Sequence, residues 1–373
     1  MYSENELQSA VSAGAITADA AEALRQHVAS LHASPAVDEE HFRLVTGFND
    51  IFVSIACLLV VFAAAGAGSA LVNAALGGLL VSIASWAMAE VFTRKRRMAL
   101  PSIILLLSFV LGAGVTAYDL LRGALPQHQV VEYDVWDGVR HRWSYWLHHP
   151  WQRALMILAG AVAGGIAALL HWRRFHVAIT IAAAVGALAL FVLASIAAIR
   201  NESAWSDPLI APAALVCGLA VFAYAMRWDI SDRTRTTQRA DIAFWLHLVA
   251  APLIAHPMFH WMGVTEGGSI GVGKAAGVVA IYISFAMIAL AVDRRALLVS
   301  ALAYVLIALA RLFDSYGAVE LSVALTALII GSALLMLSAW WQTIRGRLIG
   351  SLSAKTQMRL PPVEQVRAAL SQS

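Results

Sequence analysis

The chain has 373 residues, of which 60% are apolar and 13% are charged. That charged share is about half the usual share of a soluble domain, which excludes a disordered chain, a nucleic-acid-binding domain and a soluble multidomain enzyme as the main interpretation. The composition indicates an all-α polytopic transmembrane helix bundle in contact with the lipid bilayer. The formal net charge of +3 adds no strong field over the whole molecule.

Residues 1–49 are expected to form an acidic helical hairpin in the cytoplasm. Eight acidic residues against two arginines give residues 1–50 a formal charge of −6, which repels phosphate backbones, so no nucleic acid is expected as a partner. Gly14 can end the first helix, and Thr17 is a suitable N-cap for the second. The second helix has a narrow apolar stripe formed by Ala21, Leu24, Val28 and Leu31. We expect this stripe to pack on the first helix, on the membrane bundle or on a cytoplasmic protein partner of residues 1–40.

Residues 50–342 contain ten apolar stretches, each long enough to cross the hydrocarbon core, which takes about 20 helical residues. Because backbone groups cannot stay unpaired in lipid, each stretch is expected to be a transmembrane helix. The stretches cover approximately 51–70, 72–91, 99–120, 154–171, 177–198, 209–226, 242–262, 274–292, 296–313 and 320–341. The remaining residues, 343–373, are expected to form a cytoplasmic tail.

The distribution of lysine and arginine predicts the orientation of these helices. With the N-terminus placed in the cytoplasm, 19 of the 26 basic residues lie in inner segments and 7 in outer segments. Cytoplasmic segments of membrane proteins carry such an excess of basic residues. The sequence therefore predicts a multi-pass protein of the bacterial cytoplasmic (inner) membrane with both termini inside.

The largest outer segment, residues 121–152, is rich in tryptophan. Its apolar residues follow helical spacing at Val139, Trp143, Trp146 and Leu147. This spacing predicts a helix that lies in the outer interface and ends before Pro150. A second hypothesis gives His148 and His149, which lie among tryptophans, a role in handling a flat cofactor such as haem. The signature of known haem-handling loops is absent, so no cofactor is expected.

Two prolines and three histidines distinguish the seventh stretch. Pro252 and Pro257 lie well inside it, where each removes a backbone hydrogen bond, so a helix break is expected. His256 and His260 share one face at i, i+4 spacing, and His247 lies further back. These histidines are structural, or line a solute or proton pathway, or bind a metal. Because two ligands do not make a metal site, no metal is expected.

The ninth stretch ends with a charged pair, Arg311 and Asp314, at i, i+3 spacing. Charges within a membrane are costly and are functional candidates by default, although an arginine near the interface can also reach water. The pair either has a structural role or contacts a substrate or ion. We expect Arg311 and Asp314 to surround one outward-facing polar pocket together with His256 and His260.

Two further patterns bear on packing and chemistry. Gly160 and Gly164 place small residues one turn apart in the fourth stretch, which is typical of close helix contact.

No Ser/His/Asp order, CxxC, HExxH or pair of mid-membrane carboxylates appears, so no sequence feature calls for an enzyme.

The N-terminal part resembles bacterial families of predicted inner-membrane proteins of unknown function. The matching residues are Gly14-Ala15-Ile16-Thr17 and Phe42-Arg43-Leu44…Phe48-Asn49-Asp50. The resemblance covers about the first 60 residues most clearly and the remainder only as a pattern of many spans. It implies a bacterial inner-membrane protein with a short N-terminal hairpin, and it supplies no activity or functional residues.

Two functions are consistent with these features. The first is a small-solute transporter or permease-like protein with an outward-facing polar cavity that carries a small solute or a proton. The alternative is a non-catalytic membrane scaffold or sensor that acts through its N-terminal hairpin. A scaffold should tolerate alanine at His256 and Arg311 but lose its function when residues 1–40 are deleted.

Overall fold

The computed structural model describes residues 9–24, 48–136, 139–200, 208–233, 235, 237–265, 272–315 and 319–362. Within these ranges, the side chains of 135, 136, 139, 141, 272, 296, 297, 311–315 and 319–327 are not described. The chain divides into two compact units, Met1–Arg43 and Leu44–Ser373.

The first unit contains helical residues at 9–12 and 18–24. Gly14 has a positive φ of 70°, as expected of a glycine that ends a helix. The backbone N–H of Ala20 donates to the Thr17 hydroxyl at 3.1 Å, so the predicted N-cap is confirmed. Ala21, the first residue of the predicted apolar stripe, is buried, whereas Val28 and Leu31 lie outside the described residues.

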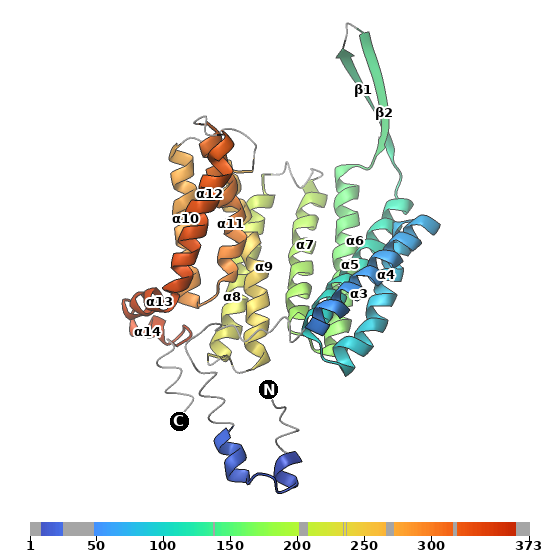
Figure 1. Ribbon diagram of the computed structural model, residues 1–373. Coiled ribbons are helices and arrows are strands. Elements are labelled where there is room, and N and C mark those ends of the chain that lie inside the picture. Colours follow the sequence, from blue (N-terminus) through green and yellow to red (C-terminus); the bar gives the residue numbers. More distant parts are fainter. Residues whose placement is uncertain are drawn as a thin grey trace. The chain divides into compact units, whose positions relative to one another are not determined.

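The second unit is a bundle of apolar helices with one β-hairpin (Figure 1). The elements in chain order are α3 (Phe48–Leu71), α4 (Ala74–Ala89), the π-helix η1 (Glu90–Lys95), α5 (Ala99–Ala124), β1 (His128–Trp136), β2 (Val139–Leu147), α6 (Pro150–Phe175), α7 (Ile179–Arg200), α8 (Ile210–Ser231), α9 (Gln238–Trp261), α10 (Val272–Val292), α11 (Ala296–Ser315), α12 (Val319–Ala339), α13 (Trp341–Gly350) and α14 (Ala354–Gln357).

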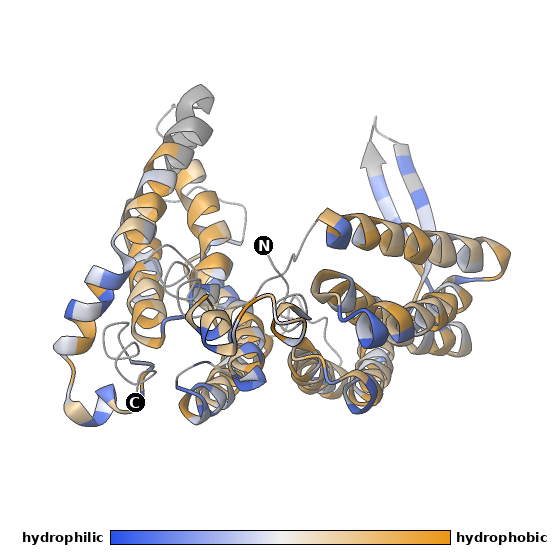
Figure 2. Cartoon of the chain, turned by 60° about the horizontal axis from the view of Figure 1, so that its bottom comes forward, coloured by the Kyte–Doolittle hydropathy of each residue, from blue (hydrophilic) through white to orange (hydrophobic). Residues whose placement is uncertain are grey.

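Eight helices in the described part of the chain, α3 to α10, are long and apolar enough to cross a membrane, with η1 continuing α4. Figure 2 shows apolar residues along these helices, with hydrophilic residues concentrated at the ends. The protein is therefore a multi-pass membrane protein. A ninth candidate consists of Leu328–Ala339 and Trp341–Gly350, which are bent by 68° at their junction. α11 and α12 lie where the last two stretches were expected. The count of ten spans and the orientation of the helices stay predictions.

The predicted interfacial helix in residues 121–152 is wrong. β1 and β2 form an antiparallel hairpin, paired from His128–Leu147 to Trp136–Val139, that projects beyond the ends of α5 and α6 (Figure 1). Alternation along a strand places every second residue on the same face, so a few apolar residues at helical spacing fit both structures. Among the described residues, the hairpin is the exception to an otherwise all-α fold.

The base of this hairpin is held by the histidines that the sequence singled out. Nε2 of His148 donates to the backbone oxygen of Arg122 at 3.2 Å, and the ring of His149 stacks on that of His128 at 3.9 Å. The backbone N–H of His149 donates to the Gln152 side chain at 2.8 Å, close to the first turn of α6. These contacts fix where β2 leads into α6.

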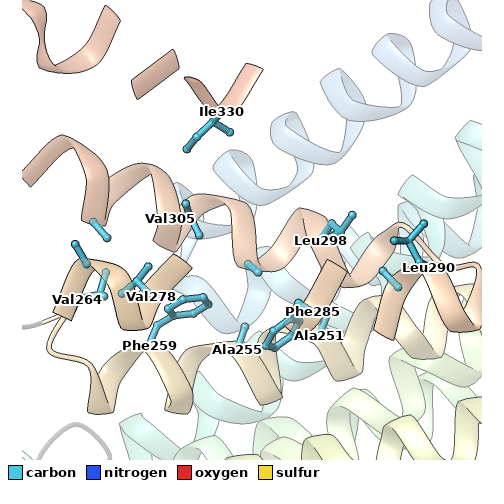
Figure 3. Packing of buried hydrophobic residues seen from close by; sticks show 14 of the residues in the cluster. Ala251, Ala255, Phe259, Val264, Val278, Phe285, Leu290, Leu298, Val305 and Ile330 are labelled. Carbon is cyan, nitrogen blue, oxygen red and sulfur yellow. The ribbon is translucent and has the colours of Figure 1, made fainter. Parts of the chain in front are cut away.

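The largest apolar core of the bundle lies between α9, α10 and α11, with Ile330 from α12 (Figure 3). Phe259 of α9 lies at its centre, fully buried, with its ring 4.9 Å from that of Tyr304 and 6.5 Å from that of Phe285. This packing ties the second half of the bundle together. Two histidine side chains of α9 form hydrogen bonds to residues outside this apolar core.

The chain after α12 folds back onto one end of this core. Arg345 of α13 donates to the backbone oxygens of Pro361 and Pro362 at 2.7 and 3.2 Å. Arg233, which follows α8, donates to the backbone oxygens of Leu360 and Gln357 at 2.9 and 3.3 Å. Two arginines from different helices therefore hold the described part of the predicted tail against the bundle.

Candidate functional site

α9 is one continuous helix that contains both Pro252 and Pro257. The helix break that we predicted at these prolines is therefore wrong. Each proline removes a backbone hydrogen bond, but neighbouring helices can hold such a helix together. Pro257 is buried, and α9 packs against α7, α8 and α11, so tertiary contacts keep the helix intact.

His256 and His260 lie on one face of α9, with their ring centroids 6.3 Å apart. Nδ1 of His256 is 2.8 Å from the hydroxyl of Tyr304 on α11, and Nδ1 of His260 is 2.7 Å from the hydroxyl of Thr265. Each imidazole therefore has a neutral hydroxyl partner. These hydrogen bonds connect α9 to α11 and to the residues that follow α9.

The outward-facing pocket that we predicted around these two histidines stays a prediction. The side chains of its other members, Arg311 and Asp314, lie outside the described residues. Two of the cavities in the described part of the bundle have volumes of about 620 and 210 Å³. The larger lies between α6, α7 and Tyr224, the smaller lies between α11, α12 and Trp341, and neither is lined by a histidine.

His247 belongs to a different polar cluster, nearer the start of α9. Its Nε2 donates to Oδ2 of Asp229 on α8 at 2.7 Å, and Arg294 donates from Nη2 to Oδ1 of the same carboxylate at 2.6 Å. Arg294 also donates to the backbone oxygen of Ala240 at 3.0 Å. The three side chains are at most 2% exposed, so this is an ion pair with a histidine inside the protein.

Asp293 forms a second buried cluster directly beside the first. Its Oδ2 accepts from Arg235 at 3.0 Å, and its Oδ1 accepts from the indole N–H of Trp341 at 2.9 Å. Nε of Arg345 is 3.5 Å from the same Oδ1. Because Arg294 is the next residue, the chain between α10 and α11 joins the two clusters. We call these side chains together the buried charge network: Asp229, Arg235, His247, Asp293, Arg294, Trp341 and Arg345.

The network contains three guanidinium groups against two carboxylates. The carbonyl groups at the end of α10 compensate part of the excess positive charge. Arg235 donates to the backbone oxygens of Val292 and Asp293 at 3.1 and 3.0 Å, and Arg345 donates to that of Leu290 at 3.2 Å. The last carbonyls of a helix carry partial negative charge and favour cations.

Two residues of the network have a left-handed backbone, Arg235 with φ 58° and Asp293 with φ 60°. This conformation is uncommon for residues other than glycine, asparagine and aspartate, so Arg235 needs compensation from its surroundings. Its three hydrogen bonds to Val292 and Asp293 supply that compensation. The turn at Asp293 buries Arg294 and leaves Arg295 exposed.

His247 is the member of the network whose side chain can exist either as a neutral imidazole or as an imidazolium. Its Nε2–H is used by Asp229, and its Nδ1 is buried without a hydrogen-bond partner among the described residues. A neutral imidazole in this position has a free lone pair at Nδ1, where one proton can be added. The arrangement can therefore accept and release a proton next to a carboxylate that is already paired with Arg294.

The sequence analysis singled out His247 but none of the residues that surround it in the network. Arg294 and Arg345 were considered only as basic residues of inner segments. A usable pattern was present: Asp293, Arg294 and Arg295 form the whole connection between two apolar stretches. A connection this short places its charged side chains close to the ends of the neighbouring helices. Asp229, an acidic residue just after the sixth stretch, is then a suitable ion-pair partner for Arg294.

No metal site is formed by the residues that the structure describes: they contain no group of three or more His, Cys, Asp or Glu side chains that could hold an ion. Comparison of the chain with protein-family models, with curated proteins and with solved structures finds no match. The candidate site therefore depends on its geometry alone.

Proposed function

We propose that the protein is a permease-like membrane protein that moves protons, alone or together with a small solute, and that the pair of Asp229 and His247 is its proton-handling centre. The observation that carries this proposal is the free, buried Nδ1 of a histidine whose other nitrogen donates to a carboxylate. Ionisable side chains within a membrane protein are costly to keep and commonly mark ion or proton pathways.

The position of His247 supports this role. It lies nine residues after the start of α9, about 14 Å along the helix axis, so the imidazole is well inside the bundle. Arg294 and Asp229 form a neutral ion pair, and a proton added to His247 gives the cluster one positive charge. A purely structural role needs no free ring nitrogen.

The test is proton flux into liposomes that contain the purified protein and a pH-sensitive dye, driven by a potassium diffusion potential. We expect the wild-type protein to acidify the lumen. We expect His247→Gln to reduce the flux to the level of protein-free liposomes, because glutamine can donate to Asp229 but cannot carry a proton at this position. Arg227→Gln, an exposed change on the same helix as Asp229, is the matched control and should leave the flux unchanged.

Two results would contradict the proposal. A wild-type protein without proton flux would show that no proton is moved. A loss of flux in His256→Gln together with normal flux in His247→Gln would instead locate the proton-handling group in the outward-facing pocket predicted from the sequence.

The second candidate function is a membrane scaffold or sensor that engages a cytoplasmic protein. One observation favours it: Met1–Arg43 is a compact unit of its own. A unit of this kind is suited to binding a partner independently of events in the membrane.

Deletion of residues 1–43 and the His247→Gln variant distinguish the two functions. If the protein is a permease, the deletion should leave the liposome flux intact while His247→Gln abolishes it. If the protein is a scaffold, the deletion should reduce the size of the complex extracted from host membranes, measured on native gels, and His247→Gln should not. A deletion that changes neither measurement would contradict the scaffold function.

A further inference from the structure

A narrow apolar groove of about 210 Å³ lies between α11, α12 and the start of α13. Its walls are formed mainly by leucines of the first two helices and an indole of the third: Leu298, Leu302, Leu334, Leu337 and Trp341. One charged residue, Arg295, also lines it, at the end where α11 begins. The groove therefore combines an apolar channel with a cation at one end.

Arg295 differs from the arginines of the buried charge network around it. Arg235, Arg294 and Arg345 are buried and ion-paired with carboxylates. Arg295 is exposed, its Cζ lies 5.0 Å from the centre of the Trp341 ring, and its guanidinium has no ion pair or hydrogen bond among the described residues. A guanidinium is well suited to bind phosphate, and here its donors are free.

The neighbouring residues place this guanidinium at the edge of the apolar layer. Trp340, exposed, and Trp341, buried, stand at the 68° bend between α12 and α13. Tryptophan is enriched where the hydrocarbon meets the lipid headgroups. Because the indole N–H of Trp341 is bound to Asp293, its ring is fixed under Arg295 and keeps the guanidinium at the groove.

We propose that this groove binds an anionic phospholipid, with one acyl chain between α11 and α12 and the headgroup phosphate at Arg295. The apolar walls match a hydrocarbon chain, and the unpaired cation at the end of the groove matches a negative headgroup. Basic pockets between membrane helices are known to bind such headgroups. Free phosphate lacks the chain that the groove accommodates, and a zwitterionic lipid brings its own cation close to Arg295.

The test measures the binding of phosphatidylglycerol and of phosphatidylcholine with identical acyl chains to the delipidated full-length protein by native mass spectrometry. The wild-type protein should bind phosphatidylglycerol about fivefold more tightly, the effect of one basic residue near a negative surface. Arg295→Gln should remove this preference, and Arg295→Lys should retain most of it. Leu302→Trp, which fills the groove, should weaken the binding of both lipids.

The matched control is Arg347→Gln, which removes the same charge from an exposed position on α13 that does not line the groove. It should leave the preference intact. An equal loss in Arg347→Gln and Arg295→Gln would overturn the proposal, because it would indicate a diffuse charge effect. Unchanged preference in Arg295→Gln, or displacement of phosphatidylglycerol by inorganic phosphate alone, would overturn it as well. Melting temperatures in detergent confirm that each variant is folded.

Discussion

Arg294→Met should lower the free energy of unfolding by about 3–5 kcal/mol, because it removes the only guanidinium ion-paired with Asp229 among the described residues. Asp229 is 2% exposed and would then be a buried carboxylate without a compensating charge. The histidine could compensate only by taking up a proton at Nδ1, which places a second buried charge in the site. Equilibrium unfolding in mixed detergent micelles measures the change.

The double variant Asp229→Asn with Arg294→Met tests whether the loss comes from the uncompensated charge. It removes both charges, and an asparagine oxygen can still accept from His247, so most of the lost stability should return. The difference between the double variant and the two single variants gives the coupling energy of the pair. Arg227→Met, on the exposed face of α8, should change stability by no more than about 0.5 kcal/mol. An equal effect of Arg227→Met and Arg294→Met would contradict the role of the ion pair.

The helices of the bundle could be predicted because lipid imposes one requirement on them: about 20 apolar residues whose backbone groups are all paired. The seventh stretch, expected at 242–262, is α9 at Gln238–Trp261, and the fifth, expected at 177–198, is α7 at Ile179–Arg200. The ends differ by a few residues. α9 begins before its apolar stretch because the polar residue Thr237 caps it.

The hairpin could not be predicted from spacing alone. Trp143 and Trp146 fit a helical face, but they are also members of a strand in which β-branched and aromatic residues recur. The decisive pattern was Asp137-Gly138 between two such runs, which is typical of a two-residue hairpin turn. The pair itself lies outside the described residues, while Trp136 and Val139 on either side of it are paired.

The candidate site depended on contacts between distant residues, and sequence spacing carries little information about them. His247 was singled out because it is a histidine within an apolar stretch. Its partners, Asp229 and Arg294, are 18 and 47 positions away along the chain and meet it only because α8, α9 and the end of α10 pack together. The predicted break at Pro252 failed for the same reason, since packing against neighbouring helices outweighs a local helix-breaking tendency.

Close contact between helices is a second feature that the sequence indicated in part. Gly160 of the predicted small-residue pair does face another helix: a Cβ atom there would lie 3.1 Å from the backbone oxygen of Gly114 on α5. The tightest contact of this kind between α4 and α5 joins Gly78 to Gly112. A Cβ atom on Gly78 would lie 2.6 Å from the Gly112 oxygen, and one on Gly112 would lie 2.7 Å from the Gly78 oxygen. Because these two oxygens belong to the backbone, side-chain rotation alone cannot relieve the overlap.

Gly112→Val should therefore lower the free energy of unfolding by about 3 kcal/mol, at the upper end of the usual range for overpacking, because α4 and α5 must move apart. The movement would also disturb the Ser82 hydroxyl, which bonds to the Phe109 backbone oxygen of α5 at 3.3 Å. Gly123→Val is the matched control in the same helix, since a Cβ atom there meets nothing within 4 Å, and it should change stability by no more than about 0.5 kcal/mol. The measurement is again unfolding in mixed micelles. Equal stability of the two variants would show that the helices do not touch at Gly112. A loss confined to Gly112→Val would establish backbone contact between α4 and α5 as a major source of stability in this half of the bundle.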